Sequence, residues 1–248
     1  MKDFAHHYLI AVAELLQRID REEGGVIREA ASVLAEAIAS GQRIFGFGCT
    51  HSSLPIQDLV YRAGGLMLIN PIMAPGISSL DVVPATMTSD IERLQGYAEV
   101  LLNNQPIQTG DVLILVSMSG RNAVPVEMGM LAQKRGIKVI GVTAIDYTQE
   151  LPSRHPSGKK MYEYADIVID TKVPKGDAIL TTEDVPQRFA PASGVASIAT
   201  LQALVAATIE ALLDRGITPP IFVSGNVPGG SEHNREMIDA YGDRVFYL

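Results

Sequence analysis

The chain has almost no cysteine and fewer basic than acidic residues. Its 248 residues include a single cysteine, Cys49, which excludes a disulfide framework and agrees with a reducing compartment. Twenty lysines and arginines stand against 28 acidic residues, giving a formal net charge of −8. Nucleic acids and anionic membranes are therefore poor partners for this chain. We expect a cytoplasmic protein with no nucleic-acid partner and no membrane partner.

Signals for metals and for membrane insertion are also scarce. The five histidines are too scattered for a metal cluster, since His6 and His7 are adjacent rather than one helical turn apart. We expect no metal and no other cofactor. The N-terminus has no apolar signal segment. The longest apolar stretch, residues 195–213, contains Gln202 and Glu210, which predicts a helix in the core or at a subunit interface rather than a membrane span.

The chain does have enough apolar material for a core. Hydrophobic residues make up 47% of it and charged residues 19%, as in a globular α/β protein of this length. Apolar residues recur at helical spacing through residues 4–19 and again through 26–38. Gly24 and Gly25 lie between the two stretches and predict a break. The first forty residues are therefore expected to form a helical hairpin.

Short apolar segments then alternate with helical patterns. This alternation predicts a parallel sheet covered by helices on both faces. We expect one domain, with helices in residues 1–40, the core in 41–215, and a last strand and helix in 216–248. The expected strands are residues 43–47, 66–69, 111–116, 138–142, 166–169 and 221–223. The expected helices are residues 54–62, 89–103, 123–135, 193–213 and 234–241, and the expected long loops are 71–84, 144–160 and 171–192.

The loop after the first strand is rich in glycine and hydroxyl groups. Gly48 allows a sharp turn and a close approach to a ligand. Thr50, Ser52 and Ser53 place hydroxyls beside the N-terminus of the next helix, where anions bind well. The alternative is a glycine turn followed by a serine N-cap. A dinucleotide fingerprint is excluded because His51 stands where its third glycine should be. A P-loop is excluded because its motif follows neither the strand at 43–47 nor the strand at 66–69.

A second loop of this kind follows the strand at 111–116. Two serines, a glycine, an arginine and an asparagine surround one point at the start of a helix: Ser117, Ser119, Gly120, Arg121 and Asn122. Such a nest suits the oxygens of a phosphate monoester, and the arginine either adds charge-assisted bonds or is a solvated surface group. Because ligands bind beyond the carboxyl ends of parallel strands, the two loops predict one phosphate pocket.

These segments resemble the sugar isomerase (SIS) domain family. The resemblance is carried by GFGCTHSS at 46–53, SMSGRN at 117–122, KVIGVT at 138–143 and ADIVID at 165–170. It covers roughly residues 40–215, and its most specific part is the Ser-x-Ser-Gly loop. Within the family, the chain is most similar to stand-alone SIS proteins related to phosphoheptose isomerase.

The resemblance implies a three-layer αβα sandwich around a five-stranded parallel sheet. It also implies a homodimer or homotetramer with sites at the subunit interfaces, and a sugar phosphate as ligand. Residues at the positions of Thr50, Ser117 and Ser119, with Asn122 beside them, hold the phosphate in such proteins. Members of the family include aldose–ketose isomerases, an etherase and ligand-binding regulatory domains.

The chain lacks the catalytic residues that the resemblance would imply. Phosphoheptose isomerases carry a catalytic glutamate on the helix after the first loop. The matching place here is near Val60, where only Asp58 is close, and the late histidine of those enzymes has no clear counterpart. The catalytic residues must therefore be sought elsewhere in the chain.

Three residues are candidates for proton transfer. His51 lies inside the first loop and would titrate near neutral pH, unless it only lines or caps the pocket. Glu92 is suited to abstracting a carbon proton when it is desolvated, but an acid at a helix start is also favoured by the helix dipole. His233 follows a glycine turn near the C-terminus. It would complete this site or a neighbour's, unless the segment is only a capping box at Ser231.

These residues predict a phosphosugar-binding protein that acts as an aldose–ketose isomerase. Such an enzyme needs a base that moves a proton between C1 and C2 and an acid–base pair for the hydroxyl protons. Two alternatives remain: a non-catalytic phosphosugar-binding or regulatory module, and a phosphosugar lyase or etherase. A DNA-binding regulator is disfavoured by the net charge and by the short segment before the first strand.

Overall fold

Five parallel strands form the centre of the molecule. The computed structural model describes residues 2–79 and 81–248. The strand order is β2-β1-β3-β4-β5, and every neighbouring pair is parallel. The strands are β1 (Ile44–Gly48), β2 (Ile69–Pro71), β3 (Val112–Val116), β4 (Lys138–Thr143) and β5 (Ile167–Asp170). The five-stranded parallel sheet expected from the sequence is therefore confirmed.

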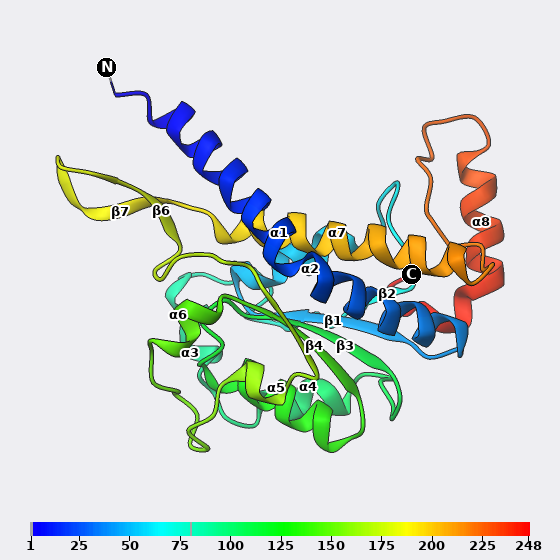
Figure 1. Ribbon diagram of the computed structural model, residues 1–248. Coiled ribbons are helices and arrows are strands. Elements are labelled where there is room, and N and C mark those ends of the chain that lie inside the picture. Colours follow the sequence, from blue (N-terminus) through cyan, green and yellow to red (C-terminus); the bar gives the residue numbers. More distant parts are fainter. Residues whose placement is uncertain (1, 80) are drawn as a thin grey trace.

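Helices cover both faces of the sheet, which gives three layers (Figure 1). One face carries α1 (Phe4–Ala39), α2 (Leu54–Leu59) and α7 (Ser193–Asp214). The other carries α4 (Tyr97–Asn103) and α5 (Ala123–Lys134). All five residues of β1 and of β3 are buried, because a parallel sheet between helix layers needs strands that are apolar on both faces.

The N-terminal helical hairpin expected from the sequence is wrong. Residues 4–39 form one continuous helix, α1, and Gly24 and Gly25 lie inside it. Two mid-helix glycines weaken a helix by roughly 1 kcal/mol each relative to alanine, but they do not break one that is anchored on both sides. Ile19 and Ile27 are buried in the same core cluster. Glu23, next to the glycines, accepts a hydrogen bond from the Asp170 N–H at 3.2 Å.

The expected helix at 89–103 is in fact two helices. The first, α3 (Thr86–Ile91), ends before Glu92, and the second is α4. Gly96 separates them with φ of +84°, a backbone conformation that favours glycine. The Gly96 N–H donates to Glu127 Oε2 at 2.8 Å. This tertiary contact fixes the turn, and local helical periodicity could not reveal it.

Four further segments differ from expectation. Residues 221–223 form no strand, because only an isolated bridge joins Ile221 to Leu66. The expected loop at 171–192 contains the antiparallel hairpin β6 (Ala178–Thr182) and β7 (Val185–Pro191). The loop expected at 144–160 contains the short helix α6 (Ile145–Gln149). The last helix, α8 (Gly230–Tyr241), begins four residues earlier than expected.

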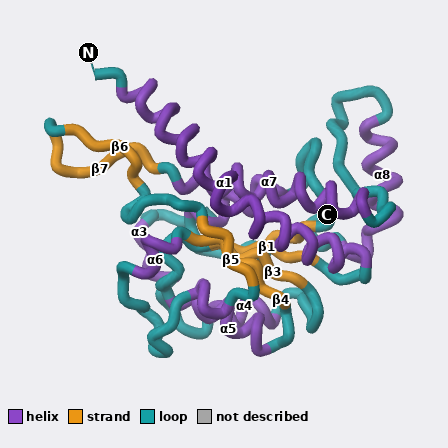
Figure 2. The backbone as a smooth tube through the Cα atoms, viewed as in Figure 1, coloured by secondary structure: helices purple, strands orange, loops and turns teal. Residues whose placement is uncertain are grey.

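The hairpin and the start of α1 form an arm that extends from the body (Figures 1 and 2). Phe4 packs edge-on against Phe189 with ring centroids 5.1 Å apart. The Tyr8 hydroxyl donates to Pro191 O at 2.8 Å. The arm carries exposed apolar side chains, with Leu9 67% and Ile10 47% exposed. We define residues 4–13 and 178–191 as the arm.

The apolar helix α7 lies across the sheet and against α1 (Figure 1). Its length and composition would allow it to cross a membrane. Leu201, Leu204 and Leu212 are fully buried and belong to the core cluster that includes α1 and the sheet. In this fold the apolar side chains of α7 therefore pack in the core.

Candidate functional site

The two hydroxyl-rich loops start side by side at the carboxyl edge of the sheet. β1 and β3 are hydrogen-bonded neighbours, with Gly48 opposite Val116. The first loop, residues 49–53, and the second loop, residues 117–122, leave these two strand ends. The structure thus brings both sequence motifs to one edge, where ligands of open α/β sheets bind.

The first loop is tightly wound around Gly48. A Cβ atom at this position would lie 2.1 Å from Ser52 O, so only glycine fits. Thr50 has φ of +52°, and its N–H donates to Ile77 O at 2.7 Å. The N–H and hydroxyl of Ser53 both donate to Thr50 O, at 3.1 and 2.7 Å. These bonds fix the loop and leave the Thr50 and Ser52 hydroxyls as the groups that can meet a ligand.

The second loop is held by its own serine and by residues beyond β4. Gly120 has φ of +55°, and its N–H donates to Ser117 Oγ at 3.2 Å. The Thr148 hydroxyl donates to Ser119 O at 2.5 Å. Ser117 is buried and Ser119 is partly exposed. The loop is therefore a rigid turn with one hydroxyl, that of Ser119, near the surface.

A small cavity joins the two loops. Its volume is about 10 Å³, enough for a single water at most. It is lined by His51, Ser52, Pro55, Met118, Ser193, Gly194 and Ser197. The last three belong to the start of α7. A ligand larger than water would have to lie over this edge rather than inside the cavity.

Glu92 lies between the two loops. Its backbone oxygen accepts the Val124 N–H at 3.1 Å, which ties it to the first turn of α5. Burial raises the pKa of Glu92. The Asn122 side chain and the charges of Arg93 and Arg154 partly oppose this rise in the pKa.

The charge of Glu92 also reaches the first loop. Burial raises the pKa of the Cys49 thiol well above its ordinary value, and the negative charge of Glu92 adds to the effect. Glu92 stands at the C-terminal end of α3, where a helix dipole disfavours a carboxylate. The alternative interpretation of Glu92 as an acid favoured at a helix start does not fit this position.

Basic side chains that the sequence analysis did not single out gather around the second loop. The backbone N–H of Arg154 donates to the backbone oxygen of Arg121 at 2.8 Å, and the backbone N–H of Met161 donates to that of Gly120 at 2.8 Å. These two bonds attach the connection between β4 and β5 to the loop. They bring Arg154 and Lys160 close to it.

These cations repel one another. Burial lowers the pKa of Arg121, and the charges of Arg154 and Arg93 lower it further. Burial and the charge of Arg121 lower the pKa of Lys160. The Arg121 Nε is buried and has no hydrogen-bond partner within residues 2–79 and 81–248. This edge is therefore locally positive in an acidic protein, and the arrangement favours an anion.

The comparison with protein families identifies an SIS domain over residues 7–144, more than half of the chain. The chain belongs to the SIS domain family. A UPF0309 protein of Streptomyces coelicolor is 47% identical to it over 243 residues, 98% of this chain and 97% of that protein. A UPF0309 protein of Oceanobacillus iheyensis is 37% identical over 245 residues, 99% of each chain.

Solved structures share the SIS fold. Phosphoheptose isomerase GmhA of Neisseria gonorrhoeae has a TM-score of 0.57 at 16% identity, over 84% of this chain and 97% of that one. The NanR protein of Vibrio vulnificus complexed with ManNAc-6P has a TM-score of 0.50 at 15% identity, over 98% of this chain and 70% of that one. At such identities the likeness shows the fold alone.

In this SIS domain, the acid on the helix after the first loop is already engaged. Asp58 Oδ2 accepts a hydrogen bond from Gln202 Nε2 at 2.8 Å, and Asp58 also pairs with Arg62. The helix ends at Leu59, so Val60 is extended. Asp58 therefore joins α2 to α7 and does not replace the absent glutamate.

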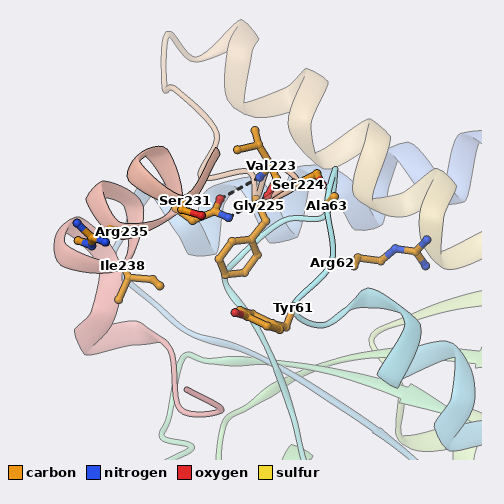
Figure 3. A pocket seen from close by; sticks show the side chains of 11 residues that line it. Tyr61, Arg62, Ala63, Val223, Ser224, Gly225, Ser231, Arg235 and Ile238 are labelled. Carbon is orange, nitrogen blue, oxygen red and sulfur yellow. Dashed lines mark hydrogen bonds between the residues drawn. The ribbon is translucent and has the colours of Figure 1, made fainter. Parts of the chain in front are cut away.

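The SIS domain does not bring His233 to the loops within one chain. His233 Nε2 lies 3.0 Å from Ile221 O. It belongs to α8, which stands at the end of the molecule opposite α3 and α6 (Figure 1). A cavity of about 480 Å³ opens beside α8, where Tyr61, Ser231 and Ile238 are among the lining residues (Figure 3). His51 and Glu92 are thus the two predicted catalytic residues that this edge holds.

Proposed function

We propose that this SIS protein binds a sugar phosphate and interconverts its aldose and ketose forms. The observation that carries the proposal is the position of Glu92, a partly buried carboxylate held between two hydroxyl-rich loops. Burial raises the pKa of Glu92, and a carboxylate with a raised pKa is a stronger base for a carbon-bound proton. Two neighbours in fold are described as a phosphoheptose isomerase and as a protein complexed with ManNAc-6P, which supports this ligand class.

The phosphate would rest on the hydroxyls of both loops. Thr50 and Ser52 would donate from the first loop and Ser119 from the second, while the buried Ser117 hydroxyl holds the turn by accepting the Gly120 N–H. Arg121 adds a guanidinium whose Nε lacks a partner within the described part of the chain. Gly48, Gly120 and Ser53 would shape the turns rather than donate, since the Ser53 hydroxyl already donates to Thr50 O. Asn122, also predicted from the sequence as a phosphate ligand, has its side-chain oxygen bonded to Arg154 and is considered separately below.

The chemistry would be a proton transfer between two carbons. Glu92 removes the proton from C2 of the aldose, which leaves an enediolate. The same carboxyl group then returns the proton to C1 and yields the ketose. His51, exposed at the edge of the first loop, exchanges the protons of the two oxygens. No electrons or atoms are gained or lost in this sequence.

Two other functions are compatible with the same loops. The glutamate that phosphoheptose isomerases carry after the first loop is absent here, which favours a phosphosugar-binding module without catalysis as the first alternative. A phosphosugar lyase or etherase is the second, because it begins with the same proton abstraction. The mass of the product separates elimination from isomerisation.

The test is turnover of a panel of hexose, heptose and amino-sugar phosphates in heavy water. We expect deuterium to enter at C2 or C1 without any other change of mass. Glu92→Gln should lower kcat by about 10²- to 10⁴-fold, the usual contribution of a general base. Glu99→Gln, an exposed glutamate on α4, is the matched control and should retain full activity. Binding without turnover would contradict the isomerase, and a product of lower mass would indicate the lyase.

We also propose that two or four copies of the chain assemble and complete the site. The cavity between the loops is about 10 Å³, so one chain offers no enclosed pocket there. The exposed apolar side chains of the arm, among them Leu9 and Ile10, are a suitable contact for a second copy. Light scattering on the purified protein measures the assembly directly. A monomer at micromolar concentration would contradict this proposal.

A further inference from the structure

The geometry points to a role for Asn122 and Arg154 that the sequence motif does not suggest. We propose that they form a relay in which Arg154 orients Asn122 and Asn122 orients the Glu92 carboxylate. In this relay Asn122 is a positioning residue for the base rather than a phosphate ligand. The inference rests on the proposed function only where it calls Glu92 the base.

The start of α5 leaves the Asn122 side chain free for this role. Asn122 is the N-cap of α5, and an N-cap asparagine normally accepts a hydrogen bond from the second or third N–H of its helix. Here the second, from Val124, donates to Glu92 O at 3.1 Å. The third position is Pro125, which has no N–H. Asn122 makes no side-chain capping bond.

The freed side chain is buried and directed by Arg154. Asn122 is only 8% exposed. Its Oδ1 accepts a hydrogen bond from Arg154 Nη1 at 3.0 Å. A cation at the amide oxygen leaves the amide nitrogen as the group that faces other partners. That nitrogen can only donate, and a carboxylate can only accept, so the orientation set by Arg154 suits Glu92.

Glu92 is then held at two points by the same turn. Its backbone oxygen accepts the Val124 N–H, and in the proposed relay its carboxyl group receives the Asn122 amide. Arg154 is fixed in turn, because its own N–H donates to Arg121 O at 2.8 Å. The carboxylate, the amide and the guanidinium thus share one rigid frame around the second loop.

The groups that influence Glu92 come from four segments of the chain. Arg93 is its neighbour at the end of α3, Asn122 belongs to α5, and Arg154 belongs to the connection after β4. The buried Cys49 belongs to the first loop, and the negative charge of Glu92 raises the pKa of its thiol. Burial raises the pKa of Glu92, whereas Asn122 and the two arginines lower it. The relay therefore opposes the effect of burial and favours the ionised form of Glu92, which a base requires.

The relay is tested by Asn122→Ala and Arg154→Gln in the full-length protein. Lys134→Gln removes an exposed charge at the far end of α5 and is the control. The first readout is the pKa of Glu92 from the carboxyl signal of protein labelled with ¹³C-glutamate, assigned with Glu92→Gln. We expect this pKa to rise in Asn122→Ala and Arg154→Gln and to stay unchanged in Lys134→Gln.

The second readout is the pH profile of kcat/KM. In Asn122→Ala we expect kcat/KM on the acidic limb to fall about tenfold, the value of a hydrogen bond to a charged group, and to recover partly as the pH rises. Binding of inorganic phosphate should change little. An unchanged Glu92 pKa in the folded Asn122→Ala and Arg154→Gln variants would overturn the relay. So would lost phosphate binding with the Glu92 pKa unchanged, because Asn122 would then be a phosphate ligand. If the Glu92 pKa rises in both variants but the wild-type protein turns over no sugar phosphate, the proposed function fails and the relay stands.

Discussion

Glu92 occupies a position that costs the folded protein stability at neutral pH. Its surroundings are dry enough that burial outweighs the favourable contacts with Asn122 and the arginines, and the pKa of Glu92 is raised. Sites of this kind exchange stability for function. The same residue therefore connects the proposed chemistry with the energetics of the fold.

This cost predicts a pH-dependent gain in stability for Glu92→Gln. The folded pKa of Glu92 lies above its ordinary value of 4.5, so the native state binds more protons than the unfolded state between the two values. Wild-type stability therefore falls as the pH rises through that window. Glutamine stays neutral, so the Glu92→Gln variant does not show this fall in stability.

Urea unfolding at several pH values checks this prediction. Glu92→Gln should be more stable than wild type at pH 7, and the difference should shrink as the pH falls toward 4. The exposed Glu99→Gln serves again as the control. A variant that is less stable than wild type at pH 7 would show that the contacts of the ionised carboxylate outweigh its burial.

Single residues also show how far the sequence reaches. Gly48, Thr50, Ser117 and Ser119 were predicted from local motifs, and the structure brings their loops to one edge because β1 and β3 are neighbours. Arg154 could not be predicted in this way. It joins the second loop through hydrogen bonds to residues 32 and 33 positions earlier in the chain, and no local pattern encodes such contacts.

Helix α1 shows how tertiary contacts override a local signal. Its two adjacent glycines are a strong sequence signal for a break, yet the helix passes through them. Burial of Ile19 and Ile27 on either side and the ion pair of Glu23 with Lys172 at 2.6 Å stabilise it as one continuous helix. In contrast, the break between α3 and α4 was missed because the Gly96 turn depends on Glu127 in another helix. The alternating apolar strands were easier to predict because each is short, buried and bounded by polar residues.

The continuous helix predicts that Gly25→Ala stabilises the protein. A Cβ at Gly25 meets nothing within 4 Å, and alanine is about 1 kcal/mol better than glycine inside a helix. The melting temperature should therefore rise by roughly 2–4 °C. Gly41→Ala is the control, because Gly41 has φ of +77° and alanine there is strained by roughly 1–2 kcal/mol. Destabilisation by Gly25→Ala in calorimetry would favour the helical hairpin.

The two regions that could bind a ligand lie at opposite ends of the molecule. The carboxyl edge collects the two loops, Glu92 and the cationic groups, although the chain carries a net charge of −8. The opposite end carries α8, His233 and the cavity beside Tyr61 (Figures 1 and 3). His233 could reach the carboxyl edge only from a second copy of the chain. The sequence predicted His51, Glu92 and His233 as one catalytic set. The fold separates His233 from the other two.

The most direct test of this account is a crystal structure of the protein grown with a mixture of sugar phosphates. We predict a phosphate in contact with hydroxyls of both loops, including Thr50 and Ser119, and the C1–C2 bond of the sugar facing the Glu92 carboxylate. A ligand bound in the cavity beside α8, or a phosphate that touches neither loop, would contradict it.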